Sequence, residues 1–196
     1  MLTRKQAIKL LKKAGCRDNV IQHCIAVSKL ATEIAKKAKE NRFPVDIKLV
    51  EIGALLHDIG RSSTHTIKHW NIGSEILKDF SLPANLTRFA EVHAGTKISA
   101  EDAKRLGIKE KDYYPKTIEE KIVAYADKLT KVRFSRKNQK WKFIFYEDIS
   151  HEISKLKKKK DLSDEQKNRI INDLIMLENE VLSLIKFKKL PYTSLN

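Results

Sequence analysis

The sequence of 196 residues contains little cysteine: only Cys16 and Cys24, with no Cys-x-x-Cys pair. Two thiols so close together exclude a disulfide framework and favour a reducing, cytoplasmic location. No apolar run reaches the roughly 18 residues that a membrane-spanning helix needs, so no membrane segment is expected. Residues 1–15 also lack the apolar centre of a secretory signal, and their helical spacing of apolar residues predicts an ordinary first helix.

Acidic residues are outnumbered, at 25 against 40 lysines and arginines, which leaves a net charge of +15. Such a surface favours anionic partners, such as nucleotides, nucleic acid or acidic lipid. The basic excess is spread along the chain, so no single stretch is predicted to be a nucleic-acid-binding arm. With 41% hydrophobic residues the chain can bury a sizeable core, and intrinsic disorder is not expected.

Apolar residues recur at helical spacing along most of the chain, and no alternating run is long enough to predict a strand. Residues 18–41 carry one apolar stripe at this spacing, made of Val20, Cys24, Val27, Ala31, Ile34 and Ala38. Capping signals predict further helix starts at Thr3, Ser99, Thr117 and Ser163, and the helix after Thr117 is expected to reach Val132. The expected fold is an all-α helical bundle.

The composition changes near residue 133, where a basic and aromatic stretch begins. We therefore expect residues 1–132 to form the main domain and residues 133–196 a basic helical extension. The extension is expected to pack on the core or to form an interface, such as that of a homodimer. Its aromatic residues between lysines are suited to stacking on bases, although packing is the preferred interpretation: Trp141, Phe143, Phe145 and Tyr146.

The stretch LVEIGALLHDIG, residues 49–60, is apolar on nearly every side, which predicts a helix buried all round. It ends with His57 and Asp58, and Gly60 is expected to stop the helix by entering the left-handed region. A buried imidazole and carboxylate need partners, because unpaired buried polar groups cost several kcal/mol. The partners must come from other segments of the chain.

Histidines are concentrated in one part of the sequence, where five of the six lie between positions 23 and 93: His23, His57, His65, His69 and His93. Asp127 interrupts another apolar helical face. Each histidine alone is most simply a core residue with a hydrogen-bond partner, but five together favour a shared purpose. Nitrogen and oxygen donors without thiolate suit Fe, Mn, Co, Ni or Zn, and a carboxylate can bridge two such ions.

The order of His23, then His57-Asp58 within LLHDIGR, then Asp127 within AYADKL resembles the HD-domain (HDIG-type) metal-dependent phosphohydrolase superfamily. The resemblance covers residues 18–132 and is closest to small archaeal single-domain members. It implies an all-α HD-domain bundle, one or two divalent transition metals, and hydrolysis of phosphate esters. It implies two ligand sets: His23, His57, Asp58 and Asp127 for one metal, and His69 and His93 with bridging Asp58 for another.

The resemblance and the basic surface together suggest nucleotides, cyclic nucleotides or RNA ends as substrates, with a phosphodiester such as a 2′,3′-cyclic phosphate preferred. Asp58 is expected to bridge or orient the nucleophile. Arg61 follows the HDIG turn and suits phosphate as a bidentate donor, unless it is a solvated loop residue. His65 either contacts substrate or replaces His69, Lys128 is a further candidate for substrate binding, and Lys68 and Lys97 are weaker ones.

Two other classes of function remain open. The same ligands on the same fold resemble those of mixed-valent di-iron oxygenases, so His69 and His93 are compatible with oxygen chemistry. The chain could also be a non-catalytic nucleic-acid-binding module in which the metal is structural. Metal analysis, dioxygen uptake and substitution of His57 or Asp58 separate these alternatives.

Overall fold

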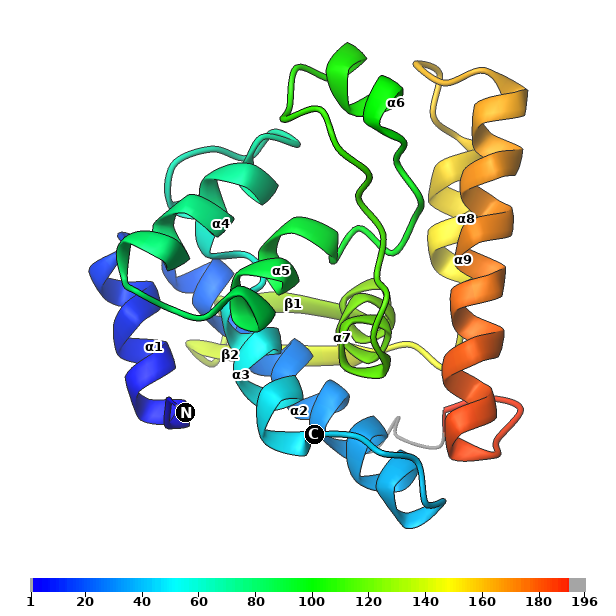
Figure 1. Cartoon of the computed structure of the whole chain (residues 1–196). Helices are drawn as coiled ribbons and strands as arrows, with labels where there is room; N and C mark the ends of the chain where they lie inside the picture. Colours follow the sequence, from blue (N-terminus) through cyan, green and yellow to red (C-terminus); the bar gives the residue numbers. More distant parts are fainter. Residues whose placement is uncertain (1, 191–196) are drawn as a thin grey trace.

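The computed structural model describes residues 2–190, which are mostly helical (Figure 1). These residues form nine α-helices, one 3₁₀ helix and two strands: α1 (Arg4–Lys13), α2 (Asp18–Glu40), α3 (Ile47–Leu56), η1 (Ile59–Ser62), α4 (His69–Asp79), α5 (Ala84–Val92), α6 (Ala100–Arg105), α7 (Ile118–Leu129), β1 (Thr130–Ser135), β2 (Lys140–Phe145), α8 (Ser150–Lys157) and α9 (Asp164–Ile185). The expected helical fold class is confirmed. No helix of this part of the chain is long and apolar enough to cross a bilayer.

Helix starts follow the local capping chemistry of the sequence. Thr3, Thr117 and Ser163 each form a capping box, in which the hydroxyl accepts from the backbone three residues on and that residue's side chain accepts from the capping residue's own N–H. Ser99 accepts a hydrogen bond from the Asp102 backbone and opens α6. These caps satisfy donors that a helix leaves unpaired in its first turn.

The core is organised around α2, which packs against α3, α7, α9 and β1. Its predicted stripe from Val20 to Ala38 is buried, and the residues of α3 from Ile52 to Leu56 are also buried, as their apolar composition predicts. Helices α4 and α5 lie on one side of this centre, and α8 and α9 stand together on the other (Figure 1). Leu177 and Val181 of α9 are buried in the same core, because α9 contacts α7 and α2.

The β1–β2 hairpin corrects two expectations: the chain does contain strands, and the helix that was to reach Val132 ends at Leu129. The strands are antiparallel and pair in register from Thr130↔Phe145 to Ser135↔Lys140. Basic residues alternate with apolar ones in both strands, which lets one face pack on α2 while the other meets water. The alternation of basic and apolar residues in VRF (132–134) and KWKF (140–143) is a strand signal. It is short, and the helical spacing of apolar residues in the rest of the chain led to its being overlooked.

Gly60 does not stop a helix in the left-handed region, so that expectation was wrong. It lies in η1, and among the described glycines only Gly15, Gly95 and Gly107 have a positive φ. A Cβ on Gly60 would lie 2.0 Å from the carbonyl oxygen of His69 and 2.6 Å from the backbone nitrogen of Gly73. The residue is needed for close approach, because η1 and α4 touch backbone to backbone at this point.

We therefore predict that Gly60→Ala lowers the free energy of unfolding by about 1–3 kcal/mol or more, because α4 has to move away from η1. Urea denaturation measures the change. Ser62→Ala in the same 3₁₀ helix is the matched control. It removes a buried hydroxyl without a hydrogen-bond partner among residues 2–190, so stability should be unchanged or higher. Equal destabilisation of the two variants would contradict the packing argument.

Candidate metal centre

Six candidate ligands from five separate parts of the fold converge on one buried point. His57 and Asp58 follow the last residue of α3, and the other four come from α2, the start of α4, the end of α5, and α7: His23, His69, His93 and Asp127. His57 has no exposed surface, and the other donors are buried or nearly so. The partners that His57 and Asp58 require are therefore supplied by residues distant in sequence.

The first group of donors lies around one carboxylate oxygen of Asp58. The Nε2 atoms of His23 and His57 lie 3.9 and 3.8 Å from Asp58 Oδ2. Asp127 closes this group, with its Oδ1 at 2.9 Å from His23 Nε2 and 3.5 Å from His57 Nε2. Two imidazoles and two carboxylates thus surround a space of the size that one metal ion occupies.

The second group lies at the other oxygen of the same carboxylate. Asp58 Oδ1 is 3.2 Å from His69 Nε2 and 3.4 Å from His93 Nε2, and the two imidazole nitrogens are 3.2 Å apart. Asp58 therefore directs one oxygen to each group of histidines. This is the arrangement in which a carboxylate bridges two ions.

Backbone carbonyls set the tautomer of three of the histidines. The Nδ1 atoms donate to carbonyl oxygens three residues earlier in the chain: His57 to Ala54 at 2.7 Å, His69 to Thr66 at 2.5 Å, and His93 to Ala90 at 3.0 Å. A carbonyl only accepts, so the proton resides on Nδ1 of the neutral ring and the Nε2 lone pair faces the centre. Metal-binding histidines are commonly oriented by such contacts.

Unsatisfied buried atoms show that the donor set fits a cation. Within residues 2–190, His57 Nε2 and Asp58 Oδ1 are buried without a hydrogen-bond partner. His69 and His93 also point two Nε2 lone pairs at each other, an arrangement that only a shared positive charge stabilises. Since all the donors are nitrogen or oxygen, the residues fit divalent transition metals such as Fe, Mn, Co, Ni or Zn.

The electrostatics of the centre favour positive charge. Burial would raise the pKa of the Asp58 carboxyl, but His57, His69 and His93 hold this pKa well below its usual range. Burial would also raise the pKa of Asp127, which Lys128, His23 and His57 keep well below normal. Both carboxylates are therefore ionised. Burial lowers the pKa of His93 to about 4, so its imidazole is a neutral donor at pH 7.

The comparisons with known proteins agree with this geometry. The family model described as HD domain matches residues 20–132, which is more than half of the chain. The chain belongs to the HD-domain family. The resemblance seen in the sequence is thereby confirmed, together with the enzyme class that it implies, a metal-dependent phosphohydrolase.

Relatives of this HD-domain protein come from archaea and bacteria. An uncharacterized protein of Methanocaldococcus jannaschii is 48% identical over 125 residues, which are 64% of this chain and 73% of that protein. The tRNA (cytidine(56)-2′-O)-methyltransferase of Picrophilus torridus is 44% identical over 63% of this chain, but only 35% of its own length is matched. Ribonuclease Y of Finegoldia magna is 30% identical over 65% of this chain and 22% of that enzyme.

A solved structure shares the fold. The HD domain of the L. monocytogenes phosphodiesterase PgpH, in complex with cyclic-di-AMP, aligns over 92% of both chains with a TM-score of 0.50 and 17% identity. At this identity the likeness concerns the fold alone. The HD-domain protein described here thus shares its architecture with that domain, including segments after residue 132.

The candidate substrate contacts differ in their relation to the metal centre. Arg61 Nε donates to Asp58 Oδ2 at 2.6 Å, and Lys128 Nζ lies 3.0 Å from Asp127 Oδ2, so both cations neutralise the carboxylates. His65 is exposed and belongs to neither group of converging donors. It lines a smaller pocket beside the centre, so its side chain is placed where it can contact a substrate. The histidine beside Asp58 is His69, not His65.

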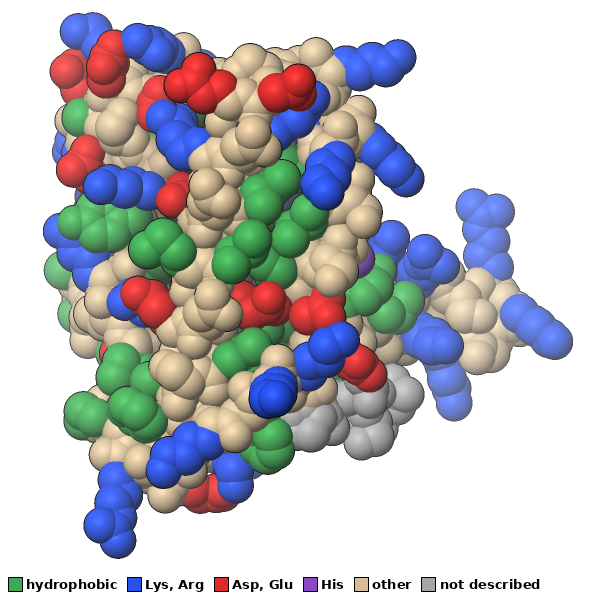
Figure 2. Space-filling view, turned by 90° about the vertical axis from the view of Figure 1, so that its right-hand side faces the viewer, with side chains coloured by type: hydrophobic (Ala, Val, Ile, Leu, Met, Phe, Trp, Pro, Cys, Tyr) green, Lys and Arg blue, Asp and Glu red, His purple; other side chains and the backbone are tan. Residues whose placement is uncertain are grey.

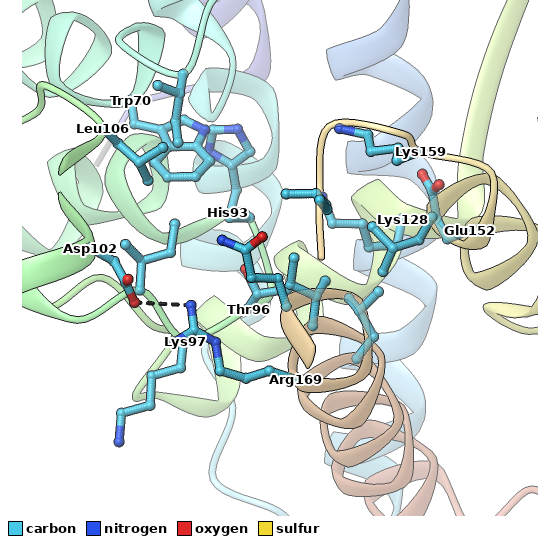
Figure 3. Close-up of a pocket in the computed structure, with 18 of the residues that line it drawn as sticks. Trp70, His93, Thr96, Lys97, Asp102, Leu106, Lys128, Glu152, Lys159 and Arg169 are labelled. Atoms are coloured by element: carbon cyan, nitrogen blue, oxygen red, sulfur yellow. Dashed lines mark hydrogen bonds and ion pairs between the residues drawn. The ribbon is translucent and has the colours of Figure 1, made fainter. Parts of the chain in front are cut away.

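A pocket of about 650 Å³ opens on the side of the centre where His69 and His93 lie. One wall comes from the segments around α4 to α6 and carries Trp70 and Leu106, while the opposite wall comes from α8 and α9 (Figure 3). The second wall carries Lys155, Lys159 and Arg169, of which Lys155 pairs with Glu152 at 3.2 Å and Arg169 pairs with Asp102 of the first wall at 2.9 Å. The pocket thus combines apolar surface with cations, which suits an anion that carries a ring system.

A second pocket of about 450 Å³ opens on the side of His23 and is lined mainly by polar atoms. The two pockets share four lining residues, which lie between them beside the metal centre: Arg61, Asp127, Lys128 and Glu152. Sequence reasoning missed Trp70, Glu152 and Arg169. No local motif distinguishes them, because their role depends only on where α4, α8 and α9 pack.

We predict that metal binding depends on Asp58 more than on any other donor, because its two oxygens serve both groups. Asp58→Asn should lower metal affinity by at least ~100-fold and remove both ions, whereas His69→Ala should leave one ion per chain. Elemental analysis after metal reconstitution measures the metal content. Bound metal should also raise the melting temperature.

His65→Ala provides the matched control for this prediction, since the residue is an exposed histidine outside both donor groups. It should keep the full metal content of the unmodified chain. Equal metal content in Asp58→Asn and in the unmodified chain would contradict the bridging role of the carboxylate.

Proposed function

We propose that this protein is a two-metal phosphodiesterase that acts on nucleotide-type phosphodiesters, such as a 2′,3′-cyclic nucleotide or an RNA end. The observation that carries the proposal is the position of Asp58, whose Oδ1 and Oδ2 each approach a separate pair of histidines. Two metal ions held close together are suited to binding both the attacking and the leaving oxygen of an in-line displacement at phosphorus.

The two pockets support a diester rather than a monoester. A phosphodiester carries an organic group on each side of phosphorus, and a monoester carries only one. The larger pocket has apolar surface for a nucleobase, including Trp70, and the smaller one is polar enough for a ribose or a second phosphate. Because Arg61 and Lys128 line both, a phosphoryl group between them would have a substituent in each pocket.

The side chains of the centre have separate tasks in this proposal. Divalent ions, when bound, supply Lewis acidity toward phosphoryl oxygens and lower the pKa of water. Arg61 uses Nε to hold Asp58, and its remaining N–H groups have no hydrogen bond within residues 2–190, so they are free to donate to a phosphoryl oxygen. Lys128 also lines both pockets, where it pairs with Asp127 at 3.0 Å.

Relatives lend further support to phosphodiester chemistry. Ribonuclease Y is named for cleavage of RNA, whose backbone is a phosphodiester, and the bound ligand of the PgpH domain, cyclic-di-AMP, is a nucleotide diester. The chain spans about a fifth of that ribonuclease and about a third of the methyltransferase, so the activities of those whole proteins are not carried over.

We predict that the metal-reconstituted protein hydrolyses bis-p-nitrophenyl phosphate and 2′,3′-cyclic nucleotides faster than nucleoside monophosphates. Arg61→Ala should lower kcat by about 10²–10³-fold, the cost of losing one oriented donor to developing charge. Arg61→Lys should recover only part of the rate, because a lysine cannot hold Asp58 and phosphate in the same planar geometry. Steady-state rates with Mn, Co, Ni, Zn and Fe measure these effects.

Asp58→Asn should abolish hydrolysis, because it removes the carboxylate between the two groups of histidines. Asp79→Asn is the control: it removes an exposed carboxylate at the end of α4 and should keep the rate of the unmodified protein. Full activity with redox-silent Zn excludes the di-iron oxygenase alternative. Dioxygen uptake with Fe, together with no phosphate-ester hydrolysis under any metal, would establish the oxygenase and overturn the proposal. Unchanged hydrolysis in Asp58→Asn would refute a role for this centre and favour the non-catalytic alternative.

A further inference from the structure

The β1–β2 hairpin, residues 130–145, carries charge of only one sign. It carries six cations and no acidic residue: Lys131, Arg133, Arg136, Lys137, Lys140 and Lys142. In Figure 2 the hairpin projects from the body of the molecule at the right, and the charged side chains seen on it are lysines and arginines. The hairpin therefore contributes six of the 40 basic residues and presents them on one projecting arm.

The strand register places these cations side by side. Arg133 is the direct cross-strand partner of Lys142, and both side chains are exposed. Like charges opposite each other destabilise a hairpin. None of the six cations forms an ion pair within residues 2–190, whereas Lys36, Lys37 and Lys78 each pair with a glutamate three residues away. A surface that retains such uncompensated repulsion is suited to an external anion.

Aromatic rings lie on the opposite face of the same hairpin, near its tip. Phe134 pairs across the strands with Trp141, and their ring centroids are 5.2 Å apart. Phe134 is 44% exposed, whereas Phe145 on the same face at the base of the hairpin is only 8% exposed. The base of this face is therefore held in the core, while the tip offers a ring surface to a ligand that stacks.

The base of the hairpin also reaches the metal centre. Thr130, Lys131 and Val132 of β1 line the smaller pocket, which His23 and Asp58 line from the other side. A polyanion bound along the hairpin could thus continue into the pocket where a phosphodiester is proposed to be cleaved. An acidic membrane surface would also match the basic residues and the exposed rings. A flat membrane cannot enter the smaller pocket, however, so the contact between the hairpin and that pocket favours a polymer.

We propose that the β1–β2 hairpin is a binding arm for single-stranded nucleic acid, which leads a strand into the smaller pocket and toward the metal centre. The phosphates contact the basic residues, and bases stack on Phe134 and Trp141. The delivery of the strand for cleavage rests on the proposed function, but binding to the arm does not. This inference replaces the expectation that no stretch of the chain forms such an arm.

The test measures binding without cleavage. The metal-free Asp58→Asn protein is titrated into a labelled single-stranded RNA oligonucleotide, and fluorescence anisotropy gives Kd at several salt concentrations. Adding Arg133→Gln/Lys140→Gln removes two phosphate contacts, which should weaken binding about 25-fold at about 0.1 M salt and lower the slope of log Kd against log salt by about 1.4. The hairpin should remain folded, because the repulsion between Arg133 and Lys142 is relieved.

The stacking contribution has its own variants. Trp141→Ala should weaken binding by about 5-fold or more with little change in the salt slope, since base stacking is not electrostatic. Trp141→Phe retains a ring and should bind nearly as well as the parent. Circular dichroism and urea denaturation establish that each variant is folded.

Lys36→Gln/Lys39→Gln is the control for net charge. It also removes two positive charges, but from the C-terminal end of α2 instead of the hairpin. It should leave Kd unchanged. Equal weakening by this variant would overturn the proposal in favour of non-specific attraction to a basic protein. The proposal would also be overturned if hairpin variants bound RNA normally but lost binding to phosphatidylglycerol vesicles. A failure of hydrolysis in the unmodified protein would refute the proposed function and leave these binding results untouched.

Discussion

The buried carboxylate of Asp58 is the constraint on which the rest of this structure depends. Its side chain is only 5% exposed, and a charge so far from water is tolerated only with close compensation. Arg61 holds one of its oxygens, and His57 together with one imidazole each from α2, α4 and α5 surrounds the carboxylate with donors for a cation. Helices that carry these side chains must therefore meet at one point, and the packing of the core satisfies this requirement.

Backbone geometry is adapted to that meeting point in two ways. Carbonyls at the ends of α3 and α5 and before α4 accept from the Nδ1 atoms of His57, His93 and His69, which leaves the Nε2 lone pairs directed inward. Gly60 lets η1 approach the first residue of α4 closely enough for His69 to reach Asp58. The chemistry of the centre and the stability of the fold are thus coupled through the same residues.

The walls of the two pockets surround this centre with segments from different parts of the chain. Helices α8 and α9, outside the family match, form one wall of the larger pocket, and the start of β1, at the end of that match, forms part of the smaller one. In the proposed function the metal centre supplies reactivity toward phosphate, and these walls contact the groups attached to that phosphate. The larger pocket takes the ring of Trp70 from α4 and basic side chains from both walls, including Lys97, Lys155 and Lys159.

The sequence by itself determined the helical fold class, the helix caps and the set of candidate donors, because periodicity, capping and the adjacent pair His57-Asp58 are local features. It did not reveal the hairpin, whose short alternation was masked by the helical spacing around it, and it suggested the wrong role for Gly60. Only the tertiary structure decided which oxygen of Asp58 faces which histidines, and that Asp127 meets His23 across 104 positions of sequence. Such contacts depend on how helices pack in three dimensions, which no local pattern specifies.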